Sequence, residues 1–177
     1  MNNNSNRKYH ILSLLVENKQ GVLARVAGLF AGRGYNIHSL TAAETEDPEI
    51  SKIIITCKDE MHVIEQVKKQ VNKIIDVIKI IDLTATKTVD RELGLVKTNY
   101  KGQQRQEIFQ VAEAFRARVV DIGQASAIFE ITGNSEKLDA FIAVLKPYGI
   151  IEDIRTGLIS LQRGLPPTQD ANTAKEK

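Results

Sequence analysis

The feature that most constrains the fold is a short polar turn, residues 18–21 (Asn-Lys-Gln-Gly), placed between an apolar segment and an amphipathic run. Apolar residues recur in that run at the spacing of one helical face: Leu23, Val26, Ala27 and Phe30. Gly34 stands where a helix needs a left-handed C-terminal cap, and Asn36 follows it. The pattern predicts a strand, a turn, a helix over residues 22–33 and a second strand.

This predicted turn brings the first amides of a helix close to polar side chains. Those amides lack partners within the helix, and the helix dipole is positive there, so the turn favours an anion. Gly21 also has a simpler explanation, because glycine eases many turns into helices. Asn18 and Asn36 could equally cap a turn or a helix. Both interpretations stay open, and the functional one predicts a small carboxylate, as on a free amino acid.

Length and composition set the class of protein. The chain has 177 residues, 42% hydrophobic and 26% charged, which is enough for one medium domain or two small ones. A net charge of +2 gives no sign of a nucleic-acid or acidic membrane surface. The single cysteine, Cys57, is expected to be a buried thiol. No apolar run nears the ~20 residues of a membrane span. Residues 1–8 lack the apolar region of a secretion signal, so we expect a cytoplasmic protein.

The predicted elements follow the order βαββαβ twice, which is the α+β, ferredoxin-like arrangement. The first set has strands at 9–16, 36–46, 50–58 and 77–83, with helices at 22–33 and 61–73. The second has strands at 92–100, 119–122, 127–132 and 150–161, with helices at 104–116 and 136–145, the last capped by Ser135. We expect one domain over residues 1–84, a second over 85–164 and a disordered tail over 165–177.

The second set lacks a counterpart of the paired asparagines and has a longer, more basic loop at 100–105, so we expect it to bind protein. Catalytic and metal-binding patterns are not visible in the sequence. His10, His38 and His62 fall on different elements without metal-ligand spacing. There is no phosphate-binding loop, no nucleophile elbow and no pair of cysteines. The sequence therefore predicts no catalytic residue and no metal site, and favours a binding protein.

Several motifs extend this prediction: Glu17-Asn18, residues 34–37, Ser39-Leu40-Thr41, Asp47-Pro48, residues 93–97, residues 132–141, Arg155-Thr156-Gly157 and Arg163-Gly164. Together they closely resemble the regulatory small subunits of acetohydroxyacid synthase, also called acetolactate synthase. The resemblance covers nearly all of the chain from Tyr9 to Gly164.

The resemblance implies an N-terminal ACT domain over residues 1–84 and a C-terminal small-subunit domain over 85–164. Members of this family bind valine, or sometimes leucine or isoleucine, between the two ACT domains of a homodimer. They dock onto a catalytic large subunit that carries thiamine diphosphate, magnesium and FAD, and they hold no cofactor themselves. That subunit joins pyruvate to pyruvate or 2-oxobutyrate in branched-chain amino-acid synthesis. The family's valine-contacting positions fall here on Asn18, Gly21, Val22, Leu23, Asn36 and Ile37.

The resemblance thus implies a non-catalytic regulatory subunit that activates its partner and confers feedback inhibition by valine. One alternative is an amino-acid-sensing ACT module that regulates a different enzyme. A second is an RNA-binding protein, because a ferredoxin-like sheet also forms the RNA recognition motif, but residues 50–58 contain no aromatic side chain for base stacking. A third, a stand-alone enzyme, is opposed by the missing catalytic residues.

Overall fold

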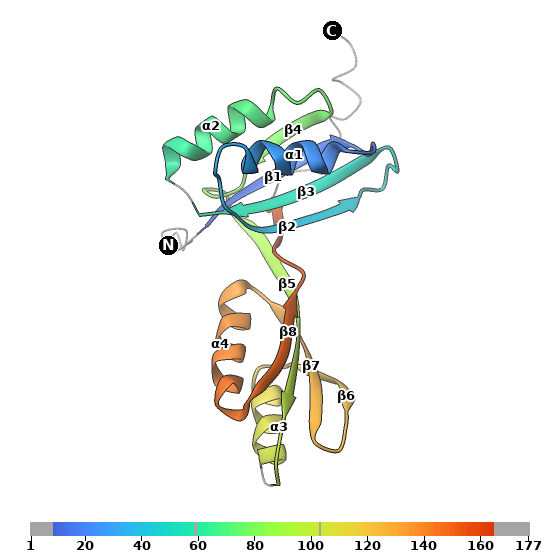
Figure 1. The fold of residues 1–177 in the computed structure, drawn as a ribbon, viewed down its shortest axis with the longest axis vertical. Helices are drawn as coiled ribbons and strands as arrows, with labels where there is room; N and C mark the ends of the chain where they lie inside the picture. Colours follow the sequence, from blue (N-terminus) through green and yellow to red (C-terminus); the bar gives the residue numbers. More distant parts are fainter. Residues whose placement is uncertain (1–8, 59, 103, 165–177) are drawn as a thin grey trace. The chain divides into compact units, whose positions relative to one another are not determined.

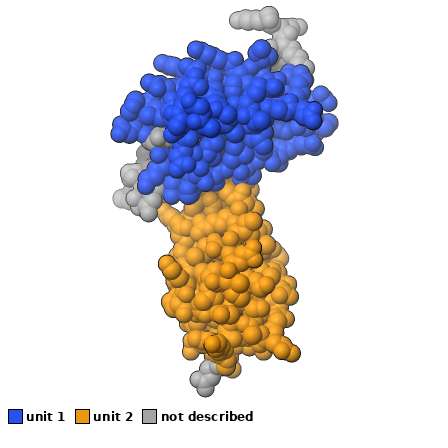
Figure 2. All heavy atoms as spheres, viewed as in Figure 1, with its two compact units in different colours: residues 1–89, 160–177 blue, residues 90–159 orange. Residues whose placement is uncertain are grey.

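A computed structural model describes residues 9–58, 60–102 and 104–164. The chain divides into two compact units, one formed by Met1–Val89 with Ser160–Lys177 and the other by Asp90–Ile159 (Figure 2). The polar start at 1–8 and the tail predicted at 165–177 lie outside the described residues. Both units have the α+β, ferredoxin-like architecture expected from the sequence, so the predicted fold class is confirmed.

The first unit is a four-stranded antiparallel sheet with two helices packed on one face (Figure 1). Its elements follow in the order β1 (His10–Glu17), α1 (Val22–Ala31), β2 (Ile37–Glu44), β3 (Ile50–Cys57), α2 (Met61–Val71) and β4 (Val77–Asp82). The strands lie in the order β2-β3-β1-β4, which leaves β2 at one edge of the sheet.

Alternation along the strands builds the core of this unit, because every second side chain of a strand points to the same face. Leu12, Leu14 and Val16 of β1 are buried against the helices, as are Ile53, Ile55 and Cys57 of β3. From α1 the buried residues are Val22, Val26 and Phe30. Val26 and Phe30 were predicted on this buried face, but Leu23, also predicted there, is 44% exposed, and Val22 is buried in its place.

The second unit repeats the layering, with α3 and α4 on one face of an antiparallel sheet (Figure 1). Its elements are β5 (Thr88–Asn99), α3 (Gln104–Ala114), β6 (Arg118–Ile122), β7 (Ser126–Gly133), α4 (Ser135–Leu145), a 3-10 turn (Lys146–Tyr148) and β8 (Ile150–Arg155). The strands lie in the order β6-β7-β5-β8. Three phenylalanines pack edge-on against one another in its core, Phe109 against Phe129 and Phe129 against Phe141.

The closing segment differs from the prediction of one strand over 150–161. It forms two strands, β8 and β9 (Ile159–Gln162), the latter paired with β5. Between them Gly157 has φ +81°, a left-handed conformation that an extended strand cannot contain. Thr156 also bonds back to Leu93, donating its amide to the Leu93 carbonyl at 3.0 Å. The break between β8 and β9 is therefore explained by the local backbone conformation at these two residues.

The residue that caps α4 also differs from the prediction. Ser135 was expected to cap this helix, but the cap is Asn134, whose side-chain oxygen accepts from the Lys137 amide at 3.1 Å. Ser135 is the first helical residue, and its hydroxyl donates to the buried carboxylate of Glu92 at 3.0 Å. The same carboxylate lies 3.6 Å from the Arg155 guanidinium. Ser135 thus joins the helix to β5 rather than capping it.

Replacing the true cap should weaken this helix. Asn134→Ala removes the acceptor for the Lys137 amide, which is expected to cost about 1 kcal/mol of unfolding free energy. Asn134→Asp keeps an acceptor and serves as the control. The measurement is denaturant unfolding together with hydrogen exchange of the Lys137 amide. Unchanged exchange in the alanine variant would contradict the assignment of the cap.

Candidate functional site

A hollow of about 270 Å³ lies in the first unit, where the ends of β1 and β2 meet the start of α1. Small-molecule sites usually enclose about 300–1,000 Å³, so this hollow suits a ligand of few atoms. It is lined by Val16, Glu17, Asn18, Lys19, Val22, Leu23, Ala42, Ala43, Glu44, Ser51 and Ile53. Three of the six predicted ligand positions, Asn18, Val22 and Leu23, are among them.

Strand register brings the polar residues of this hollow together. Ser51 of β3 lies opposite Val16 of β1 on one side and opposite Glu44 of β2 on the other. Residues paired across antiparallel strands point to the same face of the sheet. Val16 points to the helix-covered face, so Glu44 and Ser51 face that side too. Asn18, two residues after Val16, comes beside them at the end of β1.

The side-chain amide of Asn18 is held by three hydrogen bonds. Its Nδ2 donates to Glu44 Oε1 at 3.0 Å and to the Pro48 carbonyl at 2.8 Å. Its Oδ1 accepts from the Ser51 hydroxyl at 3.0 Å. The backbone amide of Asn18 adds a bond to the Glu49 carbonyl at 2.7 Å. These bonds fix the orientation of the amide and tie the turn before α1 to the β2–β3 hairpin.

The first turn of α1 lacks a capping side chain. Gly21 occupies the N-cap position with φ +84°, no side chain accepts from the first amides, and the first turn contains no acidic residue. The amide of Val22 makes a long bond of 3.3 Å to the Lys19 carbonyl. No residue in the described part of the chain accepts from the amides of Gly21 or Leu23. The helix start therefore remains a site for an anion.

Charged groups around the helix start are paired with one another. The Lys19 ammonium lies 2.7 Å from the Glu17 carboxylate, and this hydrogen bond raises the pKa of Lys19. The Arg25 guanidinium lies 2.8 Å from the Asp76 carboxylate. Another nitrogen of that guanidinium, Nη1, lies 3.5 Å from where a Cβ on Gly21 would stand. The turn thus has a cation beside it in addition to its free amides.

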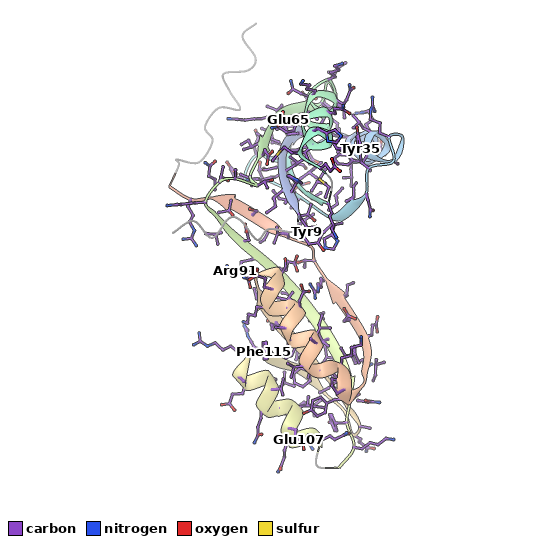
Figure 3. The ribbon with its side chains drawn as sticks, turned by 90° about the vertical axis from the view of Figure 1, so that its left-hand side faces the viewer. Tyr9, Tyr35, Glu65, Arg91, Glu107 and Phe115 are labelled. Atoms are coloured by element: carbon purple, nitrogen blue, oxygen red, sulfur yellow. The ribbon has the colours of Figure 1, made fainter. Side chains whose placement is uncertain are left out.

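Asn36 and Ile37 lie away from this hollow. Ile37 and Glu44 are the first and last residues of the eight-residue strand β2, so they are roughly 23 Å apart. Tyr35, the preceding residue, packs its ring edge-on against Phe30 at 6.3 Å, near the C-terminal end of α1 (Figure 3). Asn36 is exposed, and Ile37 is half-buried. Within one chain, the structure brings Asn18, Gly21, Val22 and Leu23 together but not Asn36 and Ile37.

Sequence reasoning missed Glu44 and Ser51 as residues of this site. They are 26 and 33 positions from Asn18 and belong to no recognisable motif with it. The signal that could have found them is the hairpin at Asp47-Pro48, because its register sets Glu44 opposite Ser51. Strand alternation then places both on the face where Asn18 lies.

In the described ranges 9–58, 60–102 and 104–164, no group of three or more histidine, cysteine or acidic residues is placed to hold a metal ion. No helix within them is long and apolar enough to cross a membrane.

Comparison with known proteins covers both units. The family model for the AHAS small subunit-like ACT domain matches residues 12–79, and the model for the small subunit of acetolactate synthase matches residues 91–164. The probable acetolactate synthase small subunit of Methanothermobacter thermautotrophicus is 47% identical, over 88% of this chain and 93% of that protein. The acetolactate synthase small subunit of Mycolicibacterium smegmatis is 45% identical, over 88% and 91%.

A solved structure agrees with these relatives. The acetolactate synthase small subunit of Thermotoga maritima superposes with a TM-score of 0.81 and 39% identity, covering 90% of this chain and 100% of that one.

The left-handed conformation of Gly21 can be tested by substitution. Gly21→Ala should lower the unfolding free energy by about 1–2 kcal/mol, because a side chain disfavours φ +84°. Gly28→Ala is the matched control, since Gly28 lies inside α1 with nothing within 4 Å of an added Cβ. That control should stabilise the helix by about 0.5–1 kcal/mol. Denaturant unfolding measures both, and equal stability of the two variants would contradict the assigned backbone conformation.

Proposed function

Because this chain belongs to the family of acetolactate synthase small subunits, we propose that it activates a separate catalytic subunit and makes that subunit sensitive to valine. The catalytic large subunit carries thiamine diphosphate, magnesium and FAD, and the reaction takes place there. The observation that carries the proposal is the hollow at the uncapped start of α1, with the Glu44 carboxylate in its lining.

The lining of the hollow matches the parts of a small aliphatic amino acid. A carboxylate fits the free amides at the start of α1, where the dipole is positive. The polar group of Asn18 lies next to those amides and is already fixed in orientation. Val22, Leu23 and Ile53 supply apolar surface for a branched side chain. Valine, leucine and isoleucine all meet this description, and valine fits the small volume best.

We further propose that the complete site needs two copies of the chain. The strand β2 forms an outer edge of its sheet, and such an edge offers backbone groups to another strand. Two copies of β2 can pair antiparallel about a two-fold axis between Leu40 and Thr41. Ile37 of one copy then lies opposite Glu44 of the second copy, at the hollow. This pairing unites all six predicted ligand positions, Asn18, Gly21, Val22, Leu23, Asn36 and Ile37, in each of two equivalent sites.

A site shared in this way explains how a small ligand could regulate an enzyme. Valine bound between two chains favours the arrangement of the dimer that closes on it. The catalytic subunit binds a different arrangement of the dimer more tightly. The two binding events are then linked, and a coupling of about 1–3 kcal/mol changes affinity roughly 5- to 150-fold. No catalytic group in this chain is required for that effect.

The proposed function is tested by a synthase assay. The acetolactate synthase activity of the catalytic subunit is measured alone and with this chain, each titrated with L-valine. Activity should rise on adding the chain and then fall as valine is added, while D-valine has little effect. If the chain neither activates the enzyme nor confers valine inhibition, the proposal is wrong.

The ligand site is tested by Asn18→Ala. A hydrogen bond to a charged group contributes about 1.5–3 kcal/mol, so valine affinity should fall roughly tenfold to 150-fold. The matched control is Asn72→Ala, at an exposed asparagine following α2. Calorimetry reports the affinities, and circular dichroism reports the fold. Equal valine affinities in the two variants would remove Asn18 from the site.

A further inference from the structure

We infer that Glu44 binds the ammonium group of the ligand and so restricts the hollow to α-amino acids over the corresponding 2-oxo acids. This inference rests on the proposed function and assigns a role to a residue outside the six predicted ligand positions. Glu44 is the last residue of β2, and its side chain belongs to the lining of the hollow.

The Glu44 carboxylate is positioned but not neutralised. Its Oε1 accepts one hydrogen bond from Asn18 Nδ2, at 3.0 Å, and that donor is a neutral amide. An ionised carboxylate offers about four acceptor sites, so most of its capacity is unused. In the part of the chain that the structure describes, no lysine, arginine or histidine forms an ion pair with it.

The other charged residues of the lining cancel each other. Glu17 and Lys19 form an ion pair at 2.7 Å, which leaves the hollow with the unpaired negative charge of Glu44. The start of α1, whose Val22 and Leu23 also line the hollow, presents free amides and a positive dipole end. The hollow therefore carries a positive wall and a negative wall within about 270 Å³.

An α-amino acid carries the matching pair of charges on adjacent groups. Its carboxylate suits the helix start, and its ammonium suits Glu44, where a charge-assisted hydrogen bond can form. A 2-oxo acid has the same carboxylate and side chain but a carbonyl oxygen in place of the ammonium. That oxygen would face the Glu44 carboxylate as acceptor against acceptor, which disfavours binding. Glu44 thus distinguishes the two classes by charge rather than by size.

Calorimetry with two ligands and three proteins tests the inference. The ligands are L-valine and 3-methyl-2-oxobutanoate, its 2-oxo counterpart, and the proteins are the wild type, Glu44→Gln and Glu46→Gln. The glutamine at position 44 keeps an acceptor for Asn18 and removes only the charge. Glu46 is an exposed carboxylate of the same hairpin outside the lining, so its variant is the matched control.

The wild type and Glu46→Gln should bind valine at least tenfold more tightly than the 2-oxo acid. Glu44→Gln should bind valine roughly tenfold to 150-fold more weakly, with its affinity for the 2-oxo acid unchanged or raised. A loss of structure would weaken the binding of both ligands equally. A change in the preference for valine therefore distinguishes the loss of the Glu44 charge from a loss of structure.

Three results would have different meanings. If the wild type binds no valine, the proposed function fails. If the wild type binds valine but Glu44→Gln keeps both the affinity and the preference, the inference about Glu44 is overturned and the proposed function stands. If the wild type binds the 2-oxo acid as tightly as valine, the inference is overturned by the unmodified protein, whatever the variants do.

Discussion

The candidate site depends on the hydrogen bonds of one side chain, the amide of Asn18. They connect the turn before α1 to the hairpin of β2 and β3 through Glu44, Pro48 and Ser51. The turn positions the free amides of the helix, and the hairpin positions a carboxylate. Since Asn18 touches both, it sets the distance between the positive and the negative wall of the hollow. The rest of the first unit acts as the support that holds these two segments in register.

Periodicity in the sequence was sufficient to predict the fold. Apolar residues repeat every second position along β1 and β3 and every third or fourth along α1 and α2, and both repeats follow from burying one face. The errors of the sequence-based prediction lie at positions where local backbone conformation or helix capping determines the structure. Gly157 splits the closing strand in two because its φ is left-handed, and Asn134 rather than Ser135 caps α4. Leu23 was placed on the buried face of α1, but Val22 is buried there instead and Leu23 is exposed.

The candidate site was predictable only in part, for two physical reasons. Asn18 and Gly21 are close in sequence, so a motif reveals them, whereas Glu44 joins them only through hairpin register. For Asn36 and Ile37 the difficulty is the reverse. The sequence predicts them in one site with Asn18, but within one chain they lie at the end of β2 away from Glu44 and the hollow. A prediction from one sequence treats a site as belonging to one chain. If the site is shared by two chains, both observations have a single explanation.

Mixing two variants tests that explanation most directly. Asn18→Ala and Asn36→Ala damage opposite ends of the proposed site, so each variant alone should bind valine weakly. In a mixed dimer, one site carries both substitutions and the other carries neither. The account predicts that mixing the two variants under conditions of subunit exchange restores tight valine binding, at one site per mixed dimer by calorimetry. Mixed samples that bind no better than either variant alone would contradict a ligand site built from two chains.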